Sequence, residues 1–502
     1  MKYTLGVDFG GSSAKGTLLC DTGNLAATAT TEYPMFFPKE GWTEQDPEQL
    51  YEAFCTVTNE IVRTSGINAD DIAAIAISAA SMTGVYLDDE DKVIRRSILW
   101  NDIRGAAFSN EFKKTKLDFI WKMTTNTPTP SRTLNHILWI KNHEPENYKK
   151  IRKIMFVKDY IRYRLTGDFV TDYIDAMGSH FMDVPNNCWS EELCGFAGIS
   201  VNMLPQILKP TDIIGPITEK AAQESGLSRK TKVIAGTTDT CMEVYANGAT
   251  KIGDMTVKLA TAGRICSITD HPILNMGIVN YHYVVPGLWY PGTVMRFCAA
   301  SYRWYRDVLS EKEIEDGKKI GKDPYVLLDE AAEKIPPGSD NLFFHPYLQG
   351  DLNNITWRAS FIGLRALHTK AHFTRALLEG VSFGMRETFE IIRDLGLKVD
   401  KPTLIGGGAK GPIWRQIMAD MFGIEMLIKE NSDSSLGSAM LSGVAVGIFS
   451  SFEDSVAKCV RITASVKPNP EVTKIYDKGF LVYREIIKAL DPIYSKMAQD
   501  QH

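Results

Sequence analysis

The chain has 502 residues, too many for one ordinary hydrophobic core, which predicts two large domains or three smaller ones. Its hydrophobic fraction of 44% and charged fraction of 23% are typical of a globular protein. The formal net charge of -5 argues against a nucleic-acid-binding or membrane-surface protein, because such proteins usually carry a basic face.

Two further features bear on where the protein works. No apolar run approaches the roughly 18 residues of a membrane-spanning helix, and the first residues lead into a strand, which argues against a secretory leader. The eight cysteines form no Cys-x-x-Cys pair, and no His/Cys spacing indicates a zinc site. We therefore expect reduced thiols and a cytoplasmic protein.

The first part of the chain opens on a strand, a turn and a second strand, predicted at residues 3–9 and 14–20. A helix is predicted to follow Asp46, which we expect to be its N-cap, with Gln49 completing a capping box. The apolar run 72–80 predicts a buried strand. Strands that alternate with helices in this way indicate an α/β protein.

The middle of the chain predicts a helix over 158–165 and a strand over 233–235 that leads into a Gly/Thr loop. Residues 255–268 then predict a second strand–turn–strand unit, with its turn at 261–264. Because this unit echoes the one at the start of the chain, we expect two lobes that open on similar hairpins. The boundary between them is predicted near residues 245–253.

The last part of the chain predicts a helix over 371–389, a strand over 403–405 and a helix over 412–422. A helix rich in small residues is expected over 436–446. The tail after about residue 450 is polar, and we predict that it is mostly helical.

The first motif with a chemical interpretation is the run 6–15, Gly-Val-Asp-Phe-Gly-Gly-Ser-Ser-Ala-Lys. A Gly/Ser turn lets backbone N–H groups face a phosphate, and Lys15 can add a positive charge. Asp8, at the end of a strand, can hold Mg²⁺ through water. The alternative is a plain hairpin turn with a surface lysine. The run is not a Walker A loop, which ends in Gly-Lys-Ser/Thr before a helix.

The second motif is the run 236–240, Gly-Thr-Thr-Asp-Thr. A carboxylate at the end of a strand, here Asp239, suits a general base that takes the hydroxyl proton during phosphoryl transfer. The alternative is an Asx-turn in which Asp239 caps the next helix.

Two more glycine-containing loops follow, at residues 259–263 and 406–410. The first is a second candidate phosphate turn, and the three glycines of the second would let an adenine or a ribose lie close to the backbone. The alternative for the second loop is a helix entry that uses glycine only for backbone geometry. We leave Arg303, in the aromatic stretch 302–305, unassigned.

The four motifs, in this order and spacing, resemble the FGGY family of carbohydrate kinases, among the actin- and hexokinase-like ATPases. The resemblance extends over nearly the whole chain, and within the family it is strongest to xylulose kinases. Further matching runs lie at 41–47, 98–102, 158–167, 361–364 and 375–380.

The resemblance implies an α/β fold of two ribonuclease-H-like domains around a central cleft. Residues 1–248 would form the N-terminal domain with the sugar site and the catalytic aspartate, and 249–450 the C-terminal domain with the nucleotide site. Residues 451–502 would form a helical tail packed on the kinase domains.

The resemblance also implies roles for individual residues and two cofactors, ATP and Mg²⁺. Asp239 matches the catalytic base, and Asp8 matches the aspartate near the metal. Substrate contacts are expected at Met82, Thr83, Asp239 and Thr240. Nucleotide contacts are expected at Ser12, Ser13, Lys15, Thr261, Gly263, Gly407, Gly408, Ala409 and Lys410.

The chain departs from the family pattern at five positions. Thr83 replaces a histidine and Ser81 a glutamine, which bears on the choice of sugar. Gly11 replaces a threonine, Ala260 a glycine and His136 a lysine, and these changes bear on nucleotide affinity or local structure.

The resemblance therefore implies a kinase that transfers the γ-phosphoryl group of ATP to a pentulose such as D-xylulose. The alternatives are a kinase of ribulose, glycerol or a tetritol, and a sugar sensor that keeps the fold without catalysis. The expected partners are a small-molecule sugar and ATP, with no nucleic acid and no membrane, and a homodimer is one candidate assembly.

Overall fold

The computed structural model describes residues 1–351, 354–397, 399–430 and 433–499. The chain forms two compact units, each built from three segments. Unit 1 comprises Met1–Thr250, Thr269–Tyr290 and Asn431–Arg461, and unit 2 comprises Lys251–Ile268, Pro291–Glu430 and Ile462–His502. The units are therefore discontinuous in sequence, whereas the predicted domains follow one another along the chain.

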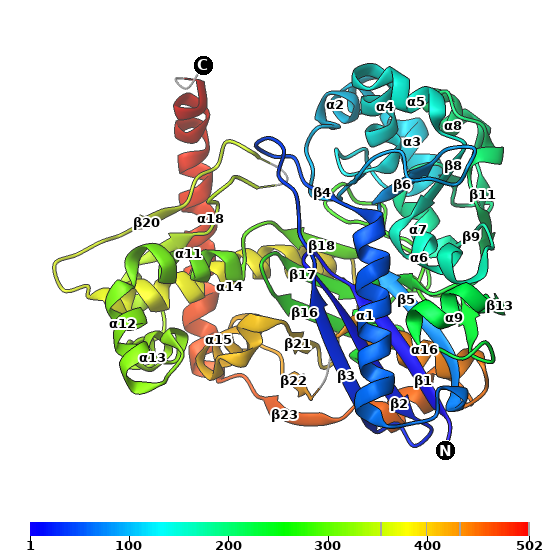
Figure 1. The fold of residues 1–502 in the computed structure, drawn as a ribbon. Helices are drawn as coiled ribbons and strands as arrows, with labels where there is room; N and C mark the ends of the chain where they lie inside the picture. The colour runs from blue at the N-terminus through cyan, green and yellow to red at the C-terminus, as the bar shows by residue number, and fades with distance from the viewer. Residues whose placement is uncertain (352–353, 398, 431–432, 500–502) are drawn as a thin grey trace. The chain divides into compact units, whose positions relative to one another are not determined.

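Unit 1 is centred on a sheet with the order β13-β14-β5-β1-β2-β3, to which β15 is added beside β5 (Figure 1). Its strands are β1 (Tyr3–Phe9), β2 (Ser13–Cys20), β3 (Leu25–Glu32), β5 (Ile72–Ala79), β13 (Ile213–Pro216), β14 (Lys232–Ile234) and β15 (Thr237–Thr238). The helices that accompany this sheet in unit 1 are α1 (Pro47–Ser65), α6 (Val157–Thr166), α9 (Glu219–Ser225), α10 (Asp239–Ala246), α16 (Ser434–Ala445) and α17 (Phe452–Cys459).

The remainder of unit 1 is a layer of short strands and helices with its own hydrophobic cluster around Leu134, Ile137 and Phe181. Its strands are β4 (Glu44–Gln45), β6 (Gly84–Leu87), β7 (Ser97–Ile98), β8 (Lys153–Phe156), β9 (Val170–Asp172), β10 (Met182–Asp183), β11 (Cys188–Trp189) and β12 (Gln206–Leu208). Its helices are α2 (Ala106–Thr115), α3 (Leu117–Thr124), α4 (Thr133–His143), α5 (Pro145–Lys150), α7 (Tyr173–Gly178) and α8 (Glu191–Ala197), and short 3₁₀ turns lie at Ala69–Asp71 and Val201–Met203.

Unit 2 is centred on a sheet with the order β18-β17-β16-β21-β22-β23. Its strands are β16 (Met255–Leu259), β17 (Gly263–Ser267), β18 (Gly292–Met295), β21 (Thr403–Ile405), β22 (Met426–Lys429) and β23 (Ile462–Val466), with β19 (Phe343–His345) and β20 (Ser360–Ile362) paired separately. Its helices are α11 (Ala299–Leu309), α12 (Glu311–Ile320), α13 (Pro324–Ala332), α14 (Lys370–Asp394), α15 (Pro412–Phe422) and α18 (Pro470–Gln499), and 3₁₀ turns lie at Ser339–Asn341 and Gly407–Lys410.

The two central sheets share one topology. In unit 1, β1, β2 and β3 are antiparallel, β1, β5 and β14 are parallel, and β13 returns antiparallel. In unit 2, β16, β17 and β18 are antiparallel, β16, β21 and β22 are parallel, and β23 returns antiparallel. The predicted α/β fold of two related domains, each opening on a hairpin, is confirmed by this repeated topology.

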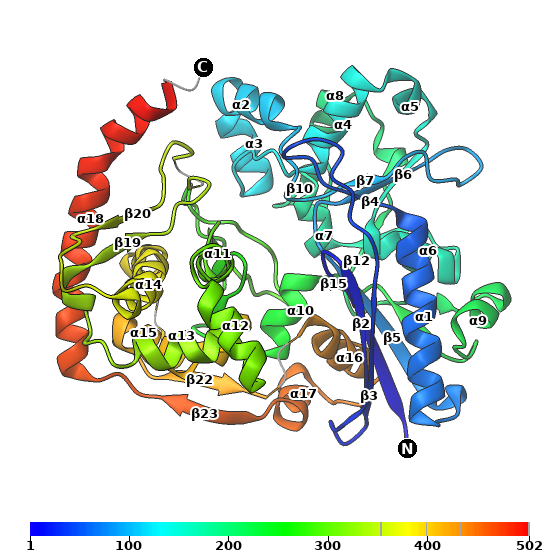
Figure 2. The same cartoon turned by 60° about the vertical axis from the view of Figure 1, so that its left-hand side comes forward.

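Two glycines on neighbouring strands bring helices against both faces of the first sheet. A Cβ on Gly16 would lie 2.4 Å from Cδ1 of Ile61 in α1, and a Cβ on Gly6 would lie 2.0 Å from the carbonyl oxygen of Ser435 in α16. Gly16 on β2 lies opposite Val7 on β1, so these two residues face the same side of the sheet. Gly6 is the neighbour of Val7 on β1 and therefore faces the other side, because successive residues of a strand face opposite sides. Helices α1 and α16 therefore cover opposite faces, as Figure 2 shows with the sheet seen nearly edge-on.

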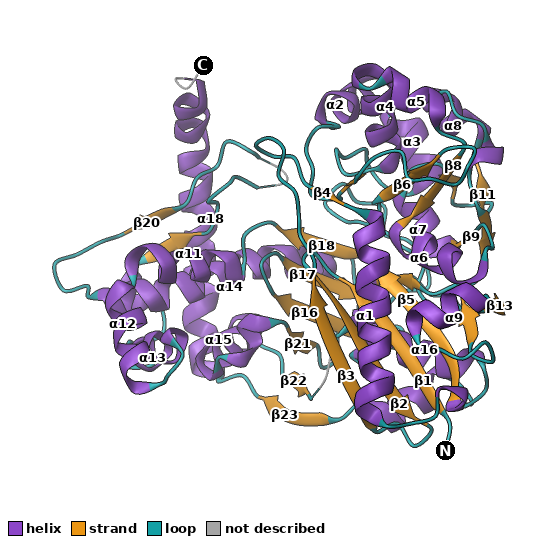
Figure 3. Ribbon diagram, viewed as in Figure 1, coloured by secondary structure: helices purple, strands orange, loops and turns teal. Residues whose placement is uncertain are grey.

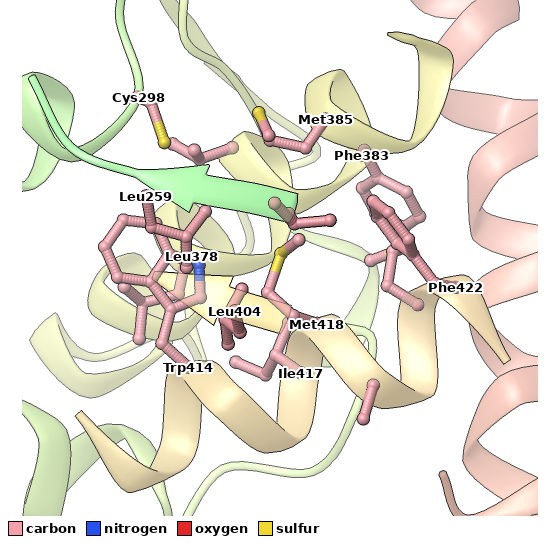
Figure 4. Packing of buried hydrophobic residues seen from close by; sticks show 14 of the residues in the cluster. Leu259, Cys298, Leu378, Phe383, Met385, Leu404, Trp414, Ile417, Met418 and Phe422 are labelled. Atoms are coloured by element: carbon pink, nitrogen blue, oxygen red, sulfur yellow. The ribbon is translucent and has the colours of Figure 1, made fainter. Parts of the chain in front are cut away.

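The core of unit 2 joins its sheet to α14, α15 and α18. Leu259 and Leu404 of the sheet pack with Leu378 and Trp414 (Figure 4), and the indole N–H of Trp414 donates to Oγ of Ser382 at 3.1 Å. Helix α18 contributes Tyr476, Phe480 and Tyr483, whose rings contact Phe383 of α14. Helix α14 is thus buried along much of its length, and it connects several parts of the unit.

Most of the predicted elements are confirmed, and Figure 3 shows the same alternation of strands and helices. Asp46 accepts a hydrogen bond from the amide of Glu48 as the N-cap of α1, and α6 ends at Gly167, whose φ is 83°. The predicted capping box is wrong, because the side-chain oxygen of Gln49 is buried without a hydrogen-bond partner among the described residues. Strand β23 interrupts the predicted helical tail between α17 and α18. In the described part of the chain, no helix combines the length and apolar character that crossing a membrane would require.

Candidate active site

Asp8 lies on β1 directly beside Ser78 of β5, with which it is in register in the parallel ladder. The hydroxyl of Ser78 donates to Oδ1 of Asp8 at 2.6 Å, and the hydroxyl of Ser438 on α16 donates to Oγ of Ser78 at 3.0 Å. Two strands and one helix therefore fix the position of this carboxyl group.

The pKa of Asp8 is raised well above its ordinary value, first by burial and then by the negative charges of Asp239, Asp433 and Glu243. The hydrogen bond from Ser78 opposes this shift without cancelling it. Like charges held together in one place favour the binding of a cation or of a proton. The four carboxyl groups thus form an acidic cluster in unit 1.

Asp239 is the first residue of α10 and directly follows the short strand β15. Its Oδ1 accepts hydrogen bonds from the amide of Thr240 at 2.5 Å and from the hydroxyl of Thr240 at 3.2 Å. Oδ2 has no hydrogen-bond donor among the described residues. The alternative, an Asx-turn in which Asp239 caps the helix, is wrong, because the N-cap of α10 is Thr238 and Asp239 accepts from the next residue, Thr240. One oxygen of Asp239 is held by Thr240, and the other can accept a proton.

Lys15 lies on β2, two residues after the turn, and its Nζ contacts Oδ2 of Asp433 at 2.5 Å. Burial alone would raise the pKa of Asp433, but the charge and hydrogen bond of Lys15 lower it, helped by Ser435 and the amide of Leu436. Asp433 is the N-cap of α16, and this residue is absent from the sequence-based site. The run Asp-Ser-Ser before a helix of small residues is an N-cap signal, but nothing in that signal indicates the distant lysine.

In the predicted phosphate turn at Ser12 and Ser13, side chains from other parts of the chain donate hydrogen bonds to the backbone carbonyls. The hydroxyl of Tyr33 donates to the carbonyl of Gly10 at 2.6 Å, and Nε2 of Gln45 donates to the carbonyl of Gly11 at 2.7 Å. The side chain of Ser12 is exposed. The turn therefore has fixed carbonyls and leaves its serines open to a ligand.

The predicted sugar contacts differ from one another in accessibility. Thr83 is 1% exposed, and its hydroxyl faces the carbonyl of Ser81 at 3.4 Å. Met82 is partly exposed and has a φ of 69°, which is unusual for a residue other than glycine. Ser81 is also partly exposed. Ser81 and Met82 are therefore better placed than Thr83 to meet a ligand from this segment.

Ser81 connects the same segment to a buried charge network that the sequence did not reveal. Its hydroxyl donates to Oδ1 of Asp175 on α7 at 2.9 Å. Nζ of Lys158 lies 2.8 Å from Oδ2 of Asp172 and 3.3 Å from Oδ2 of Asp175. Burial raises the pKa of Asp175 to about 7, against the opposing charge of Lys158. Asp175 can thus accept or donate hydrogen bonds near neutral pH.

His136, which the resemblance predicts to stand in place of a lysine, lies on α4 and is fully buried. Burial lowers its pKa to about 3, so the imidazole is neutral. Both ring nitrogens lack a hydrogen-bond partner among the described residues. The side chain at this position is therefore a buried, neutral ring.

The second candidate phosphate turn lies in unit 2, between β16 and β17. Thr261 is exposed, its carbonyl accepts from the amide of Cys298 at 3.0 Å, and its hydroxyl accepts from Arg303 at 3.1 Å. A Cβ on Gly263 would lie 2.4 Å from Sδ of Met385 on α14, so a larger residue here would displace that methionine side chain. Arg303, unassigned from the sequence, thus lies at the candidate phosphate turn.

The glycine loop of unit 2 forms a 3₁₀ turn over Gly407–Lys410, before α15. Gly407 and Lys410 are exposed, and a Cβ on Gly407 would meet no atom within 4 Å. Gly408 packs on Trp414, whose Cζ3 lies 2.8 Å from the position of an added Cβ, and Ala409 is buried. The exposed part of this loop, at Gly407 and Lys410, leaves space for a ligand. Met82, Thr83, Asp239 and Thr240 thus belong to unit 1, and Thr261, Gly263 and the glycine loop belong to unit 2.

The residues around Asp8 fit a magnesium ion that is held mainly by water and phosphate. Mg²⁺ is usually bound by one or two carboxylates together with waters and substrate phosphates. Within the described ranges, no group of three or more His, Cys, Asp or Glu side chains could hold a metal ion by itself. Burial, together with the negative charges of Asp239, Asp433 and Glu243, raises the pKa of Asp8, and a divalent cation would stabilise the ionised carboxylate in this environment.

Comparison with known proteins agrees with this arrangement. The FGGY family of carbohydrate kinases matches through its N-terminal domain at residues 3–245 and its C-terminal domain at residues 255–446. The chain belongs to the FGGY family and is a carbohydrate kinase, an enzyme that transfers a phosphoryl group to an alcohol.

Individual relatives differ in the sugar that they are named for. A xylulose kinase of Bacillus subtilis is 31% identical over 492 residues, 97% of each chain, and a gluconokinase of the same organism is 30% identical over 512 residues, 99% of this chain and 98% of its own. Among solved structures, a ligand-bound xylulose kinase from Lactobacillus acidophilus has a TM-score of 0.91 at 26% identity and covers 99% of this chain and 100% of its own. These similarities support the class of enzyme but leave the sugar open.

Proposed function

We propose that this enzyme transfers the γ-phosphoryl group of ATP to a hydroxyl of a pentulose such as D-xylulose, with Asp239 as the general base. The observation that carries the proposal is the arrangement of Asp239, which has one oxygen fixed by Thr240 and the other without a donor among the described residues. An alcohol is a poor nucleophile at neutral pH unless a base takes its proton as the new bond forms.

Each remaining group has a role in this scheme. The side chains of Ser12, Ser13 and Lys15 would bind phosphate oxygens, with Asp433 holding Lys15 in place. Asp8 would hold water molecules of a bound Mg²⁺, which neutralises charge on the transferred group when present. In unit 2, Thr261, Gly263 and the loop from Gly407 to Lys410 would bind the rest of the nucleotide. A homodimer and a cytoplasmic location remain predictions.

A keto-pentose is favoured over gluconate because a xylulose kinase is 31% identical over 97% of this chain. The charges near Ser81 balance closely, since Asp159, Asp172 and Asp175 are paired with Lys158 and Arg162 and the pKa of Asp175 is about 7. D-Gluconate is the natural competitor because gluconokinases are among the relatives.

The test is a coupled measurement of ADP release with a panel of D-xylulose, D-ribulose, glycerol, erythritol and D-gluconate. We expect the highest kcat/KM for a pentulose. In Asp239→Asn, kcat should fall by about 10²–10⁴, because that is the usual contribution of general base catalysis. Asp89→Asn, at an exposed position, is the matched control and should retain full activity.

Three outcomes would contradict parts of the proposal. A clear preference for gluconate or glycerol would reject the pentulose assignment. Near-normal kcat in a folded Asp239→Asn protein would reject the general base. Absence of ADP release with every sugar, in a protein that still binds sugars, would favour a sensor.

A further inference from the structure

A carboxylate on α13 lies against the glycine loop of unit 2. Oδ2 of Asp329 is 2.7 Å from the position that a Cβ on Gly411 would occupy. Gly411 directly follows the exposed Lys410, and α15 begins at the next residue, Pro412. Asp329 therefore borders the loop that is expected to bind the nucleotide, although no sequence motif includes this residue.

The carboxylate of Asp329 is oriented by one hydrogen bond and retains free acceptor capacity. The hydroxyl of Tyr302 on α11 donates to Oδ1 at 2.8 Å. Among the described residues, Tyr302 is the only hydrogen-bond donor to the carboxylate of Asp329, and no cation pairs with this carboxylate. The side chain is only partly buried, so a ligand can reach it.

Capping of α15 does not account for this arrangement. A carboxylate near a helix start is usually held by amides of the first turn. Here the amide of Gly411 donates to the carbonyl of Gly408, Pro412 has no N–H, and no amide of that turn bonds to Asp329 among the described residues. The position of Asp329 thus needs another explanation.

The charge of Asp329 selects for ligands that donate hydrogen bonds. Burial raises its pKa to about 6, against the hydrogen bond from Tyr302, so at neutral pH the group is mostly ionised and accepts only. Both ribose hydroxyls are donors. On the polar edges of adenine, the amino donor lies next to a ring nitrogen that is an acceptor. A carboxylate would repel that nitrogen.

The neighbour of Tyr302 indicates how the nucleotide is oriented in unit 2. Arg303 donates to Oγ1 of Thr261 at the candidate phosphate turn, while Tyr302 holds Asp329. Two consecutive residues of α11 therefore belong to different contacts. Arg303 supplies a positive charge suited to phosphates, and Tyr302 orients the carboxylate of Asp329, which is suited to a sugar. Phosphate and ribose are adjacent in a nucleotide, which matches this order.

We propose that Asp329 accepts hydrogen bonds from the ribose hydroxyls of the nucleotide and makes the enzyme selective for ribonucleotides over deoxyribonucleotides. The inference rests on the proposed function, because it requires that the loop from Gly407 to Lys410 binds the nucleotide. It adds a residue that determines which nucleotide is used.

The experiment measures binding of ADP, 2′-deoxy-ADP and 3′-deoxy-ADP to the full-length protein by isothermal titration calorimetry. Wild type should bind at least one deoxy form about 10- to 100-fold more weakly than ADP, because a hydrogen bond to a charged group is lost. In Asp329→Asn, the affinity for ADP should fall by a similar factor, and the difference between ADP and that deoxy form should shrink to within about 3-fold. Glu330→Gln, at the next and exposed position, is the matched control and should behave as wild type.

A second variant and a stability measurement separate binding from folding. Tyr302→Phe removes the hydroxyl that orients the carboxylate, so it should weaken the discrimination partially without removing the charge. If Asp329→Asn lowers Tm but leaves the ratio of ADP to deoxy-ADP affinities unchanged, the residue is structural and the proposal is wrong. Equal binding of all three nucleotides by wild type would also overturn it.

Calorimetry keeps this test distinct from that of the proposed function. If no sugar is phosphorylated but ADP binding depends on Asp329 as described, the proposed reaction fails and the ribose contact stands. If sugars are phosphorylated but the deoxy forms bind as well as ADP, the ribose contact fails and the reaction stands.

Discussion

At the scale of single residues, the acidic cluster around Asp8 predicts a cost in stability that depends on pH. The raised pKa of Asp8 means that the folded protein binds this proton more tightly than the unfolded chain. The contribution of the protonated group to stability is therefore complete below about pH 3.9, the ordinary value for aspartate, and is lost as the pH rises through the folded-state pKa.

Asp8→Asn should therefore stabilise the protein at pH 8 in the absence of nucleotide and Mg²⁺, while abolishing activity. We expect its free energy of unfolding to exceed that of wild type by about 1–2 kcal/mol, as for other relieved active-site strain. The difference should shrink toward pH 4, as urea denaturation at several pH values would show.

Asp433→Asn provides the opposite case. The pKa of Asp433 is lowered, so its ionised form contributes stability that is present above the unfolded value and lost as the pH falls through the folded-state pKa. This variant should be less stable than wild type at pH 8. A destabilising Asp8→Asn substitution at pH 8 would contradict the repulsion on which this argument depends.

Sequence reasoning selects residues whose signal is local and gives no signal for residues whose partner is distant along the chain. Asp8, Lys15 and Asp239 each follow or precede a turn of small residues, and a strand end is where such groups gather. Asp433 is 418 positions from Lys15, so no spacing could connect them. The sequence gives no signal for Asp175 or Asp329 for the same reason. Asp175 accepts a hydrogen bond from Ser81 and Asp329 from Tyr302, and in each pair the partner lies on a different element.

At the scale of elements, helix α16 depends on the absence of a side chain at Gly6. A Cβ at this position would lie 2.0 Å from the carbonyl oxygen of Ser435 and 2.3 Å from the amide nitrogen of Ala439. Because both are backbone atoms of a helix, neither can rotate away. The approach of α16 to β1 is thus set by one glycine, and it places Ser435 and Asp433 beside the site.

Gly6→Ala should therefore lower both stability and activity. Overpacking usually costs about 1–3 kcal/mol, and a clash with backbone atoms belongs at or above the upper end of that range. Thermal denaturation should show a reduced Tm, and kcat should fall because Asp433 moves with α16.

Gly195→Ala in α8 is the control for this prediction. A Cβ there would meet no atom within 4 Å, and the backbone is helical with no positive φ. Alanine should stabilise this helix by about 0.5–1 kcal/mol. If Gly6→Ala has the Tm of wild type, then α16 can move at no cost and the packing argument is wrong.

The order of the helices and strands along the chain was largely predictable, but the assignment of α16 to unit 1 was not. Periodicity and small residues indicated a helix near 436–446, as observed at Ser434–Ala445. Nothing in those residues says that the helix covers β1, the first strand of the chain. That fact comes from Gly6 and from the hydrogen bond between Thr17 and Ser435, at 2.7 Å.

At the scale of the whole molecule, the chain passes repeatedly from one unit to the other. Unit 1 takes its last segment, Asn431–Arg461, from a part of the chain that follows most of unit 2. A protein cut near the predicted domain boundary would therefore leave unit 1 without α16 and α17. The continuous domains predicted from the sequence therefore do not coincide with the compact units of the structure, each of which consists of three segments.

The fragment 1–250 should for this reason fail to fold alone. It lacks Leu436, Met440 and Leu441, which are at most 3% exposed and each contribute about 1.5–3 kcal/mol when buried. Their combined loss is comparable with the roughly 5–15 kcal/mol by which a native protein is stable. Urea denaturation of the isolated fragment, followed by circular dichroism, should show no cooperative transition.

Co-expression with residues 251–502 should rescue the fragment, because that piece carries α16. Rescue should disappear when residues 434–445 are deleted from the second piece or when the first carries Gly6→Ala. These variants connect the prediction to the contact between α16 and β1, as opposed to general protection by a larger partner. A cooperative transition in the isolated fragment would show that the sheet of unit 1 is stable without α16, and that the discontinuous unit is not required for folding.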